Sequence, residues 1–419
     1  MSMQSHPLPP SPEVAEEARR RAARLAEGLY PHQVDGVAFL LGRRRSILAD
    51  DMGLGKTRQS VVAMHEAAPQ GPWLVICPAA VKLNWAREIG MARPDAEVRV
   101  VGPGPVPAPD YRGWSVVNYD LLRKHESALK ALPWAGFIFD EAHFLKNHQT
   151  QRSRHGRALV EAAPENPAVM CLTGTPITNR PRDLFPLLQL LKHPMAQSFL
   201  TFAKRYCAAY KNDYGWVTDG ASNLAELKTQ LDGVLLRRTK EEVLDLPPKV
   251  RTYVPLEIPE GVGRQEMRQA LRLLMGGGAT NVGARSRDRM RLLGALTTAR
   301  HKVAMAKTPL TEEFVENVLD QGDKALVFSC FDDPLQKLAR HFGEKAVLVT
   351  GATPVKKRQQ LVDRFQQDEN TRVFLANIIA GGVGLNLTAA RQVVFNDLDW
   401  VPANHFQAED RAYRIGQNG

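Results

Sequence analysis

The sequence is poor in cysteine and has no long apolar run. Its 419 residues include only 4 cysteines, and no two of them form a CxxC pair. This absence argues against a zinc ribbon and against a disulfide framework, and it favours a reducing compartment. No stretch approaches the roughly 18 apolar residues of a membrane span, and the first residues lack the apolar core of a signal peptide. We therefore expect no membrane partner and a cytoplasmic protein (nucleoid-associated in a bacterium or phage-infected cell), or a nuclear one in a eukaryote.

The histidines also lack the spacing of a metal site. None of the 11 occurs in an HxxxH or HExxH pattern, so a zinc hydrolase is not indicated. What the chain has in excess is positive charge: 55 lysines and arginines against 45 acidic residues, a net charge of +10. Such an excess favours an anionic partner, nucleic acid first and an acidic membrane surface second.

Short apolar runs alternate with helix-like segments in two regions of the chain. The first region is 46–176 and the second is 324–397. Nearly all-apolar strands that alternate with helices predict parallel sheets covered on both faces. The stretch between them is helical in pattern, rich in aromatics over 181–250 and dense in arginine over 255–305. The length suggests two or three domains, and the two α/β regions look like two copies of one architecture.

The first apolar run leads into a glycine-rich turn, DDMGLGKT, and then into a predicted helix. Gly53 and Gly55 allow backbone N–H groups to close around phosphates, Lys56 reaches the β- and γ-phosphates, and the Thr57 hydroxyl is placed to bind Mg²⁺. The strict GxxxxGK[ST] pattern is not met, because Asp50 stands where the first glycine belongs. The turn predicts a nucleotide-phosphate site.

An acidic pair follows another apolar strand. Asp140 and Glu141 begin the sequence DEAH directly after 136-GFIF. Asp140 is predicted to hold Mg²⁺ through water, as the second acidic motif of P-loop enzymes does, and Glu141 to orient and deprotonate the attacking water. Alone, the pair could also be a helix cap and a surface acid; the preceding phosphate loop favours the catalytic interpretation. The next strand ends in LTGTP, which suits either a relay of the nucleotide state or a plain turn.

Two arginines near the end of the sequence are candidates for catalysis. Arg411 and Arg414 lie three residues apart in QAEDRAYRIGQ, which places them on one face of a predicted helix. Aimed across a cleft at a γ-phosphate, they would act as arginine fingers. The alternative is a pair of surface arginines in ion pairs.

The order of these motifs resembles the SNF2 family of ATP-dependent DNA translocases in helicase superfamily 2. LYPHQVDGV resembles the Q motif of that family, which implies that Gln33 reads adenine. The segments that resemble motifs I to III are ILADDMGLGKT, LVICPAAVKLNW, VVNYDLL, FDEAHFLKN and CLTGTPITN. Those that resemble motifs IV to VI are KALVFSCF, TGATPVKKRQQLVDRFQ, AGGVGLNLTAA and QAEDRAYRIGQ. LRRTKEEVLDLPPK, from residue 236, resembles a block distinctive of this family.

The resemblance implies a DNA-dependent ATPase that uses ATP and Mg²⁺. It would move along double-stranded or forked DNA without separating the strands, as in chromatin remodelling and DNA repair. AMAKTPLTEEFVENVL, from residue 304, resembles the annealing-helicase branch. Two alternatives remain: a strand-separating DEAH-type helicase, and a catalytically weak DNA-binding scaffold.

The resemblance also implies an α/β fold with two RecA-like lobes, parallel sheets and a helical insertion between them. Asp51 stands where the family usually has Glu, and Tyr413 where it usually has His. We expect the second lobe to end early, because the sequence stops two residues after the last motif. The predicted divisions are an N-terminal tail and helix at 1–29, an ATP-binding lobe at 30–180, a helical protrusion at 181–250, a basic helical linker at 251–305 and a second lobe at 306–419.

Overall fold

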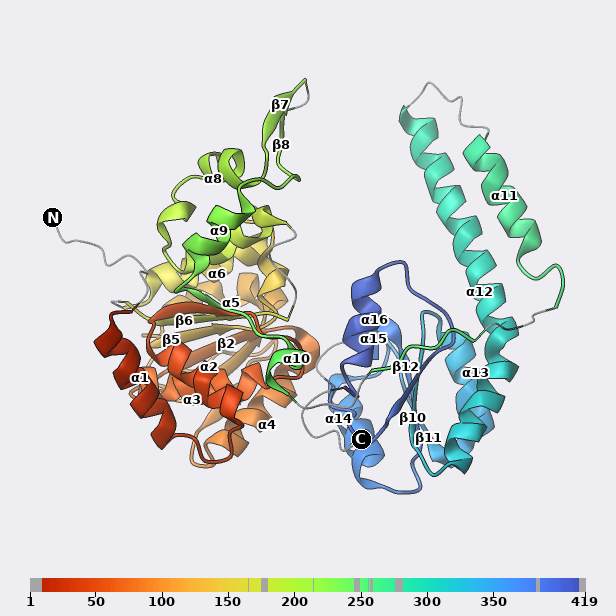
Figure 1. The fold of residues 1–419 in the computed structure, drawn as a ribbon, viewed down its shortest axis with the longest axis horizontal. Coiled ribbons are helices and arrows are strands. Elements are labelled where there is room, and N and C mark those ends of the chain that lie inside the picture. The colour runs from red at the N-terminus through yellow and green to blue at the C-terminus, as the bar shows by residue number, and fades with distance from the viewer. Residues whose placement is uncertain are drawn as a thin grey trace. The chain divides into compact units, whose positions relative to one another are not determined.

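The chain forms two compact units, Met1–Asp245 and Leu246–Gly419 (Figure 1). The computed structural model describes residues 10–164, 166–174, 180–213, 215–244, 249–254, 256, 259–275, 282–381 and 385–413. Each unit contains a sheet whose strand pairs are all parallel. The predicted α/β class with two parallel-sheet lobes is therefore confirmed.

The first unit is built on a seven-stranded sheet in the order β3-β4-β2-β5-β6-β1-β9. Most of its strands are fully buried, as their apolar composition predicts. Because all strands run the same way, the segments that follow them gather at one edge of the sheet, where open parallel sheets bind ligands. The strands are β1 (Arg45–Leu48), β2 (Trp73–Cys77), β3 (Val98–Val100), β4 (Trp114–Asn118), β5 (Gly136–Phe139), β6 (Ala168–Leu172) and β9 (Leu235–Leu236).

Helices cover this sheet in two layers, with α1 to α4 on one face and α5 and α6 on the other (Figure 1). The cap of α1 is formed by Ser11, whose Oγ accepts from Val14 N at 3.3 Å, and Pro12 occupies the first turn. The helices are α1 (Pro12–Arg24), α2 (Pro31–Leu41), α3 (Lys56–Ala67), α4 (Lys82–Ala92), α5 (Leu122–Lys130) and α6 (Gln151–Ala162), with 3₁₀ turns at Ala79–Val81, Tyr119–Leu121 and Ala142–Leu145.

The stretch from 181 to 244 combines short helices with short strands. Aromatic rings pack at its centre, where Phe185 meets Phe199 and Phe202. The sequence pattern predicts helix here, but β9 joins the main sheet beside β1 and a hairpin of β7 and β8 also forms. These strands are too short and too exposed to leave a periodic apolar signal. The elements are α7 (Phe185–Leu190), α8 (Phe199–Tyr206), β7 (Tyr210–Asn212), β8 (Gly215–Val217), α9 (Leu224–Leu231) and α10 (Lys240–Val243), with 3₁₀ turns at Pro181–Leu184 and Pro194–Ala196.

The second unit has a four-stranded sheet in the order β11-β12-β10-β13. A long helix, α12, packs beside α11 and continues to the sheet (Figure 1), where Thr311 Oγ1 donates to Asn396 Oδ1 at 2.7 Å. The elements are α11 (Arg264–Met275), α12 (Val282–Asp320), β10 (Ala325–Ser329), α13 (Asp332–Phe342), β11 (Ala346–Val349), α14 (Val355–Gln367), β12 (Val373–Asn377), α15 (Ile378–Gly381), β13 (Gln392–Phe395) and α16 (Pro402–Glu409), with a 3₁₀ turn at Gly343–Lys345. Within the described ranges, no helix combines the length and the apolar character needed to cross a membrane.

Candidate nucleotide-binding site

The glycine-rich loop lies between β1 and α3, as the sequence predicts. Gly53 and Gly55 adopt φ values of 88° and 74°, in the left-handed region that side chains disfavour. Gly55 is also the N-cap of α3, so Lys56 and Thr57 begin the helix. Backbone N–H groups at a helix N-terminus attract phosphate, and the loop therefore fits the phosphates of a nucleotide.

The ammonium group of Lys56 lies within the loop. Its Nζ donates to the carbonyl oxygens of Asp50 and Asp51, at 2.6 and 3.0 Å. Burial lowers the pKa of Lys56, whereas surrounding carboxylates, with Glu141 first, raise it. Gly174, after β6, packs directly on the loop: a Cβ there would lie 2.4 Å from Met52 Cγ and 3.5 Å from Lys56 Nζ. The LTGTP segment thus meets the phosphate loop, and only its first three residues are described.

The acidic pair follows β5 at the same edge of the sheet. Asp140 Oδ2 accepts a hydrogen bond from the indole of Trp85 at 2.7 Å, and its Oδ1 accepts from the backbone N–H of Glu141 at 2.9 Å. Burial raises the pKa of Asp140 to about 6; the Glu141 carboxylate adds to this, and Trp85 and Lys56 oppose it. Glu141 has a φ of 47°, which is unusual for a residue with a side chain. Strained backbone of this kind clusters at functional sites.

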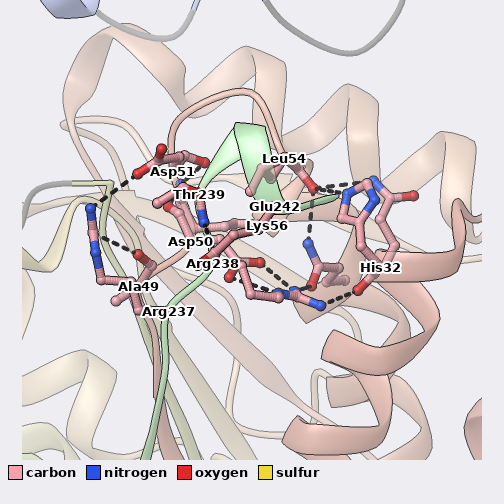
Figure 2. A network of polar contacts seen from close by, with 12 residues as sticks. His32, Ala49, Asp50, Asp51, Leu54, Lys56, Arg237, Arg238, Thr239 and Glu242 are labelled. Carbon is pink, nitrogen blue, oxygen red and sulfur yellow. Dashed lines mark hydrogen bonds and ion pairs between the residues drawn. The ribbon is translucent and has the colours of Figure 1, made fainter. Parts of the chain in front are cut away.

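The Q-motif helix, α2, is tied to the loop through one carbonyl group. Leu54 O accepts from Gln59 Nε2 at 2.9 Å, His32 Nε2 at 3.1 Å and Gln33 Nε2 at 3.4 Å (Figure 2). Burial lowers the pKa of His32, which favours the neutral ring that donates from Nε2. Gln33 Oε1 accepts from Tyr30 N at 3.0 Å. The structure thus places Gln33 against the phosphate loop; its role as the adenine reader stays a prediction.

Two arginines that sequence reasoning did not assign to the site also contact this loop. Arg238 binds both carboxylate oxygens of Asp50, and Arg237 Nη2 lies 3.1 Å from Asp51 Oδ1 (Figure 2). Both arginines follow β9, in the LRRTKEE segment. The sequence signal that could have indicated these arginines is the pair of aspartates at the start of the loop, because a buried carboxylate requires a partner that donates hydrogen bonds or carries positive charge.

Arg411 belongs to the second unit, and it lies beyond the helix that was predicted to carry it. α16 ends at Glu409, so the prediction of a shared helix face is wrong for Arg411. Here N–H groups bond three residues back, Arg411 N to Ala408 O at 3.1 Å and Ala412 N to Glu409 O at 3.1 Å, which tightens the last turn. Arg411 is buried, and its carbonyl accepts from Leu387 N at 3.0 Å. Arg414 lies outside the described residues.

A glycine-rich loop after β1 and an acidic pair after β5 of a parallel sheet are the features of a P-loop nucleotide-hydrolysing protein. Residues 32–261 match the SNF2-related domain, and residues 310–416 match the helicase conserved C-terminal domain. The first match covers more than half of the chain, which therefore belongs to the SNF2 family of helicase-related ATPases. The predicted family and the predicted class of DNA-dependent ATPase are confirmed, and this class uses a nucleotide together with a divalent metal.

Curated relatives match along nearly the whole chain. The mouse DNA annealing helicase and endonuclease ZRANB3 is 33% identical over 94% of this chain and 38% of its own length. The SWI/SNF-related matrix-associated actin-dependent regulator of chromatin subfamily A-like protein 1 of Xenopus tropicalis is 34% identical over 94% of this chain and 42% of its own length. The chain thus spans about two fifths of the length of these relatives. A solved structure, the Sulfolobus solfataricus SWI2/SNF2 ATPase core in complex with dsDNA, is 27% identical with a TM-score of 0.47, over 93% of this chain and 85% of that one.

Proposed function

We propose that the chain is an ATP-driven motor that moves along double-stranded DNA without separating its strands. It acts on forked DNA or on protein–DNA complexes. The observation that supports this most is the match over 94% of the chain to relatives that include a DNA annealing helicase. The net charge of +10 agrees with a polyanionic track. The predicted division, with an ATP-binding lobe at 30–180 and a second lobe at 306–419, is part of this proposal.

In this proposal the first unit binds ATP and Mg²⁺. Gly53, Gly55 and the start of α3 surround the phosphates, and Lys56 turns from the loop carbonyls to the β- and γ-phosphates. Thr57 and Asp140 would hold Mg²⁺, the latter through water, and the bound ion would supply positive charge to the phosphates. Gln33 reads adenine.

Hydrolysis then needs a base and a positive group at the γ-phosphate. Glu141 orients the attacking water and takes its proton. Arg411 and Arg414 of the second unit provide positive charge for the transferring phosphoryl group. Arginine fingers contribute about 10³- to 10⁵-fold to turnover in phosphoryl-transfer enzymes.

Duplex or forked DNA is expected to stimulate ATP hydrolysis, with no strand released from a tailed duplex. Contacts to the phosphate backbone should also make binding insensitive to sequence and steeply dependent on salt, with a slope of about −0.9 in log K against log salt for each phosphate contact. The assays are ATP turnover with single-stranded, duplex and forked DNA, strand displacement from a tailed duplex, and binding of two unrelated duplexes at several salt concentrations.

The other two candidate functions give different results in these assays. ATP-dependent release of a strand would indicate a DEAH-type helicase. DNA binding with no ATP turnover would indicate a scaffold. A flat salt dependence would contradict a motor that tracks the DNA backbone.

Trp85→Phe is expected to weaken both the fold and the metal site. It removes the N–H that Asp140 Oδ2 accepts at 2.7 Å, and leaving a buried acceptor unsatisfied costs about 1–3 kcal/mol. The control is Trp134→Phe: both indoles are about 1% exposed, and Trp134 donates to Leu129 O, also at 2.7 Å. Urea unfolding should show a similar loss for both variants, whereas only Trp85→Phe should raise the magnesium concentration needed for half-maximal turnover. Equal magnesium dependence in the two variants would leave Trp85 with a packing role alone.

A further inference from the structure

Asp50 carries a carboxylate that is fully buried beneath the phosphate loop. Its side chain is 0% exposed and that of Arg238 is 13% exposed. The guanidinium binds both carboxylate oxygens, Nε to Oδ1 at 3.0 Å and Nη2 to Oδ2 at 2.5 Å. A paired, two-pronged contact of this kind fixes geometry as well as charge. Loss of either partner would leave the other as an uncompensated buried charge, which is strongly unfavourable.

Arg238 also joins the loop to the two helices beside it. Its Nη1 donates to His32 O in α2, and its Nη2 donates to Gln59 Oε1 in α3 at 3.0 Å (Figure 2). Gln59 in turn donates to Leu54 O at 2.9 Å. One guanidinium therefore connects the first residue of the loop, the Q-motif helix and the helix that begins with Lys56.

The space for this network exists because residue 36 of α2 is glycine. A Cβ at Gly36 would lie 1.8 Å from Gln59 Oε1 and 2.9 Å from Arg238 Nη2. Gln59 is fully buried, so neither group has free room in which to move. Gly36→Ala should thus disturb the network without changing a charge.

Arg237, the neighbour of Arg238, likewise contacts the carboxylate of Asp51, the next residue of the loop. Arg237 Nη2 lies 3.1 Å from Asp51 Oδ1, and Asp51 N donates to Arg238 O at 3.0 Å. The carbonyl groups of Asp50 and Asp51 are the two acceptors of Lys56 Nζ. The residues whose side chains the arginines hold are therefore the same residues that hold the phosphate-binding lysine.

We propose that Arg238, assisted by Arg237, is a positioning residue for the nucleotide site. It acts through Asp50 to set the loop conformation from which Lys56 and the N–H groups of α3 reach the phosphates. The Asp50–Arg238 pair thereby supports the loop at the position where the common P-loop pattern has its first glycine. This inference rests on the proposed ATP site.

The test compares Arg238→Gln, Arg238→Lys and Gly36→Ala with the parent. Misplacement of reacting groups by about 1 Å can cost about 10²-fold in rate. We expect Arg238→Gln to weaken ATP binding about tenfold and to lower DNA-stimulated turnover about a hundredfold. Loss of residues that orient the ligands of metal sites has effects of about this size. Arg238→Lys keeps the charge but lacks the planar guanidinium that binds both carboxylate oxygens of Asp50, so its defect should be intermediate. Gly36→Ala should shift both quantities in the same direction.

The matched control is Arg205→Gln. Arg205 also binds both oxygens of a carboxylate in the first unit, that of Glu226, but the pair is exposed. ATP affinity is measured with a fluorescent ATP analogue, well below the unfolding temperature of each variant. Backbone hydrogen exchange over residues 50–57 without nucleotide is the second readout. We expect faster exchange there in Arg238→Gln than in Arg205→Gln.

Parent-like ATP affinity and parent-like exchange in the folded Arg238 variants would overturn the inference, even if their unfolding temperature falls. If Arg238→Gln does not fold, Arg238→Lys and Gly36→Ala decide by the same criteria. If the parent neither binds nor hydrolyses ATP, the proposed function fails, whereas exchange over 50–57 still reports whether Arg238 orders the loop.

Discussion

Lys56→Ala is expected to abolish ATP hydrolysis while DNA binding remains largely intact. The ammonium group lies among the loop carbonyls and near the carboxylates of Glu141 and Asp140, and in the proposed function it binds the phosphates. Removal of one preorganised donor at a site of developing charge costs about 10²- to 10³-fold in rate. In the proposed function DNA is held by many contacts to its phosphate backbone, and Lys56 is not among the residues that make them. The measurements are ATP turnover with saturating DNA and duplex affinity, each for the purified variant.

The matched control for this substitution is Lys324→Ala in the second unit. Lys324 Nζ also donates to two backbone carbonyls, Phe365 O at 2.6 Å and Asp368 O at 2.8 Å, and burial lowers its pKa as well. It should lose some stability and keep its turnover per folded molecule. Turnover by Lys56→Ala at the rate of the parent would refute the assignment of the loop to phosphate binding.

Glu141→Gln is expected to bind ATP and DNA normally and to hydrolyse ATP about 10²- to 10⁴-fold more slowly, the range for loss of a general base. The amide has the shape of the carboxylate but cannot accept the proton of the attacking water. Glu141 lies just after β5 with a φ of 47°, and glutamine has nearly the same size and shape, so the replacement should leave the backbone in place. Nucleotide affinity and single-turnover hydrolysis, measured on the same preparation, separate binding from chemistry.

Glu126→Gln provides the comparison for Glu141→Gln. Glu126 Oε2 contacts His155 Nδ1 at 2.5 Å, much as Glu141 Oε2 lies 3.2 Å from His143 Nδ1, yet Glu126 is in α5, away from the phosphate loop. It should hydrolyse ATP at the rate of the parent. If the two variants are equally active, Glu141 is not the base.

The parts of the site that local sequence specifies were predictable. Apolar runs predicted β1 and β5. Lys56 and Asp140 could then be located, because each lies in the segment that follows one of these strands. Side-chain partners were not predictable, because they join distant segments: Arg238 is 188 residues from Asp50, and Trp85 is 55 residues from Asp140. Periodicity reports which face of an element is buried, but not what the element meets.

The end of the last helix illustrates a second limit. Spacing alone placed Arg411 on a helix with Arg414, but helix ends depend on the hydrogen bonds of the final turn. The charges of Lys249 and Arg251, which pair with Glu409 at the last position of α16, come from far earlier in the chain. A pattern of three-residue spacing carries no information about such partners.

The contacts of Arg237 and Arg238 with the phosphate loop also have a mechanical consequence. The chain leaves the first unit soon after α10 and enters the second at Leu246. A load on the second unit that is transmitted along the covalent chain therefore reaches α10 and Arg238 before it reaches any other group that contacts the loop. If the chain moves along DNA as proposed, the tension that it generates would reach the residues that we propose to position the phosphate loop.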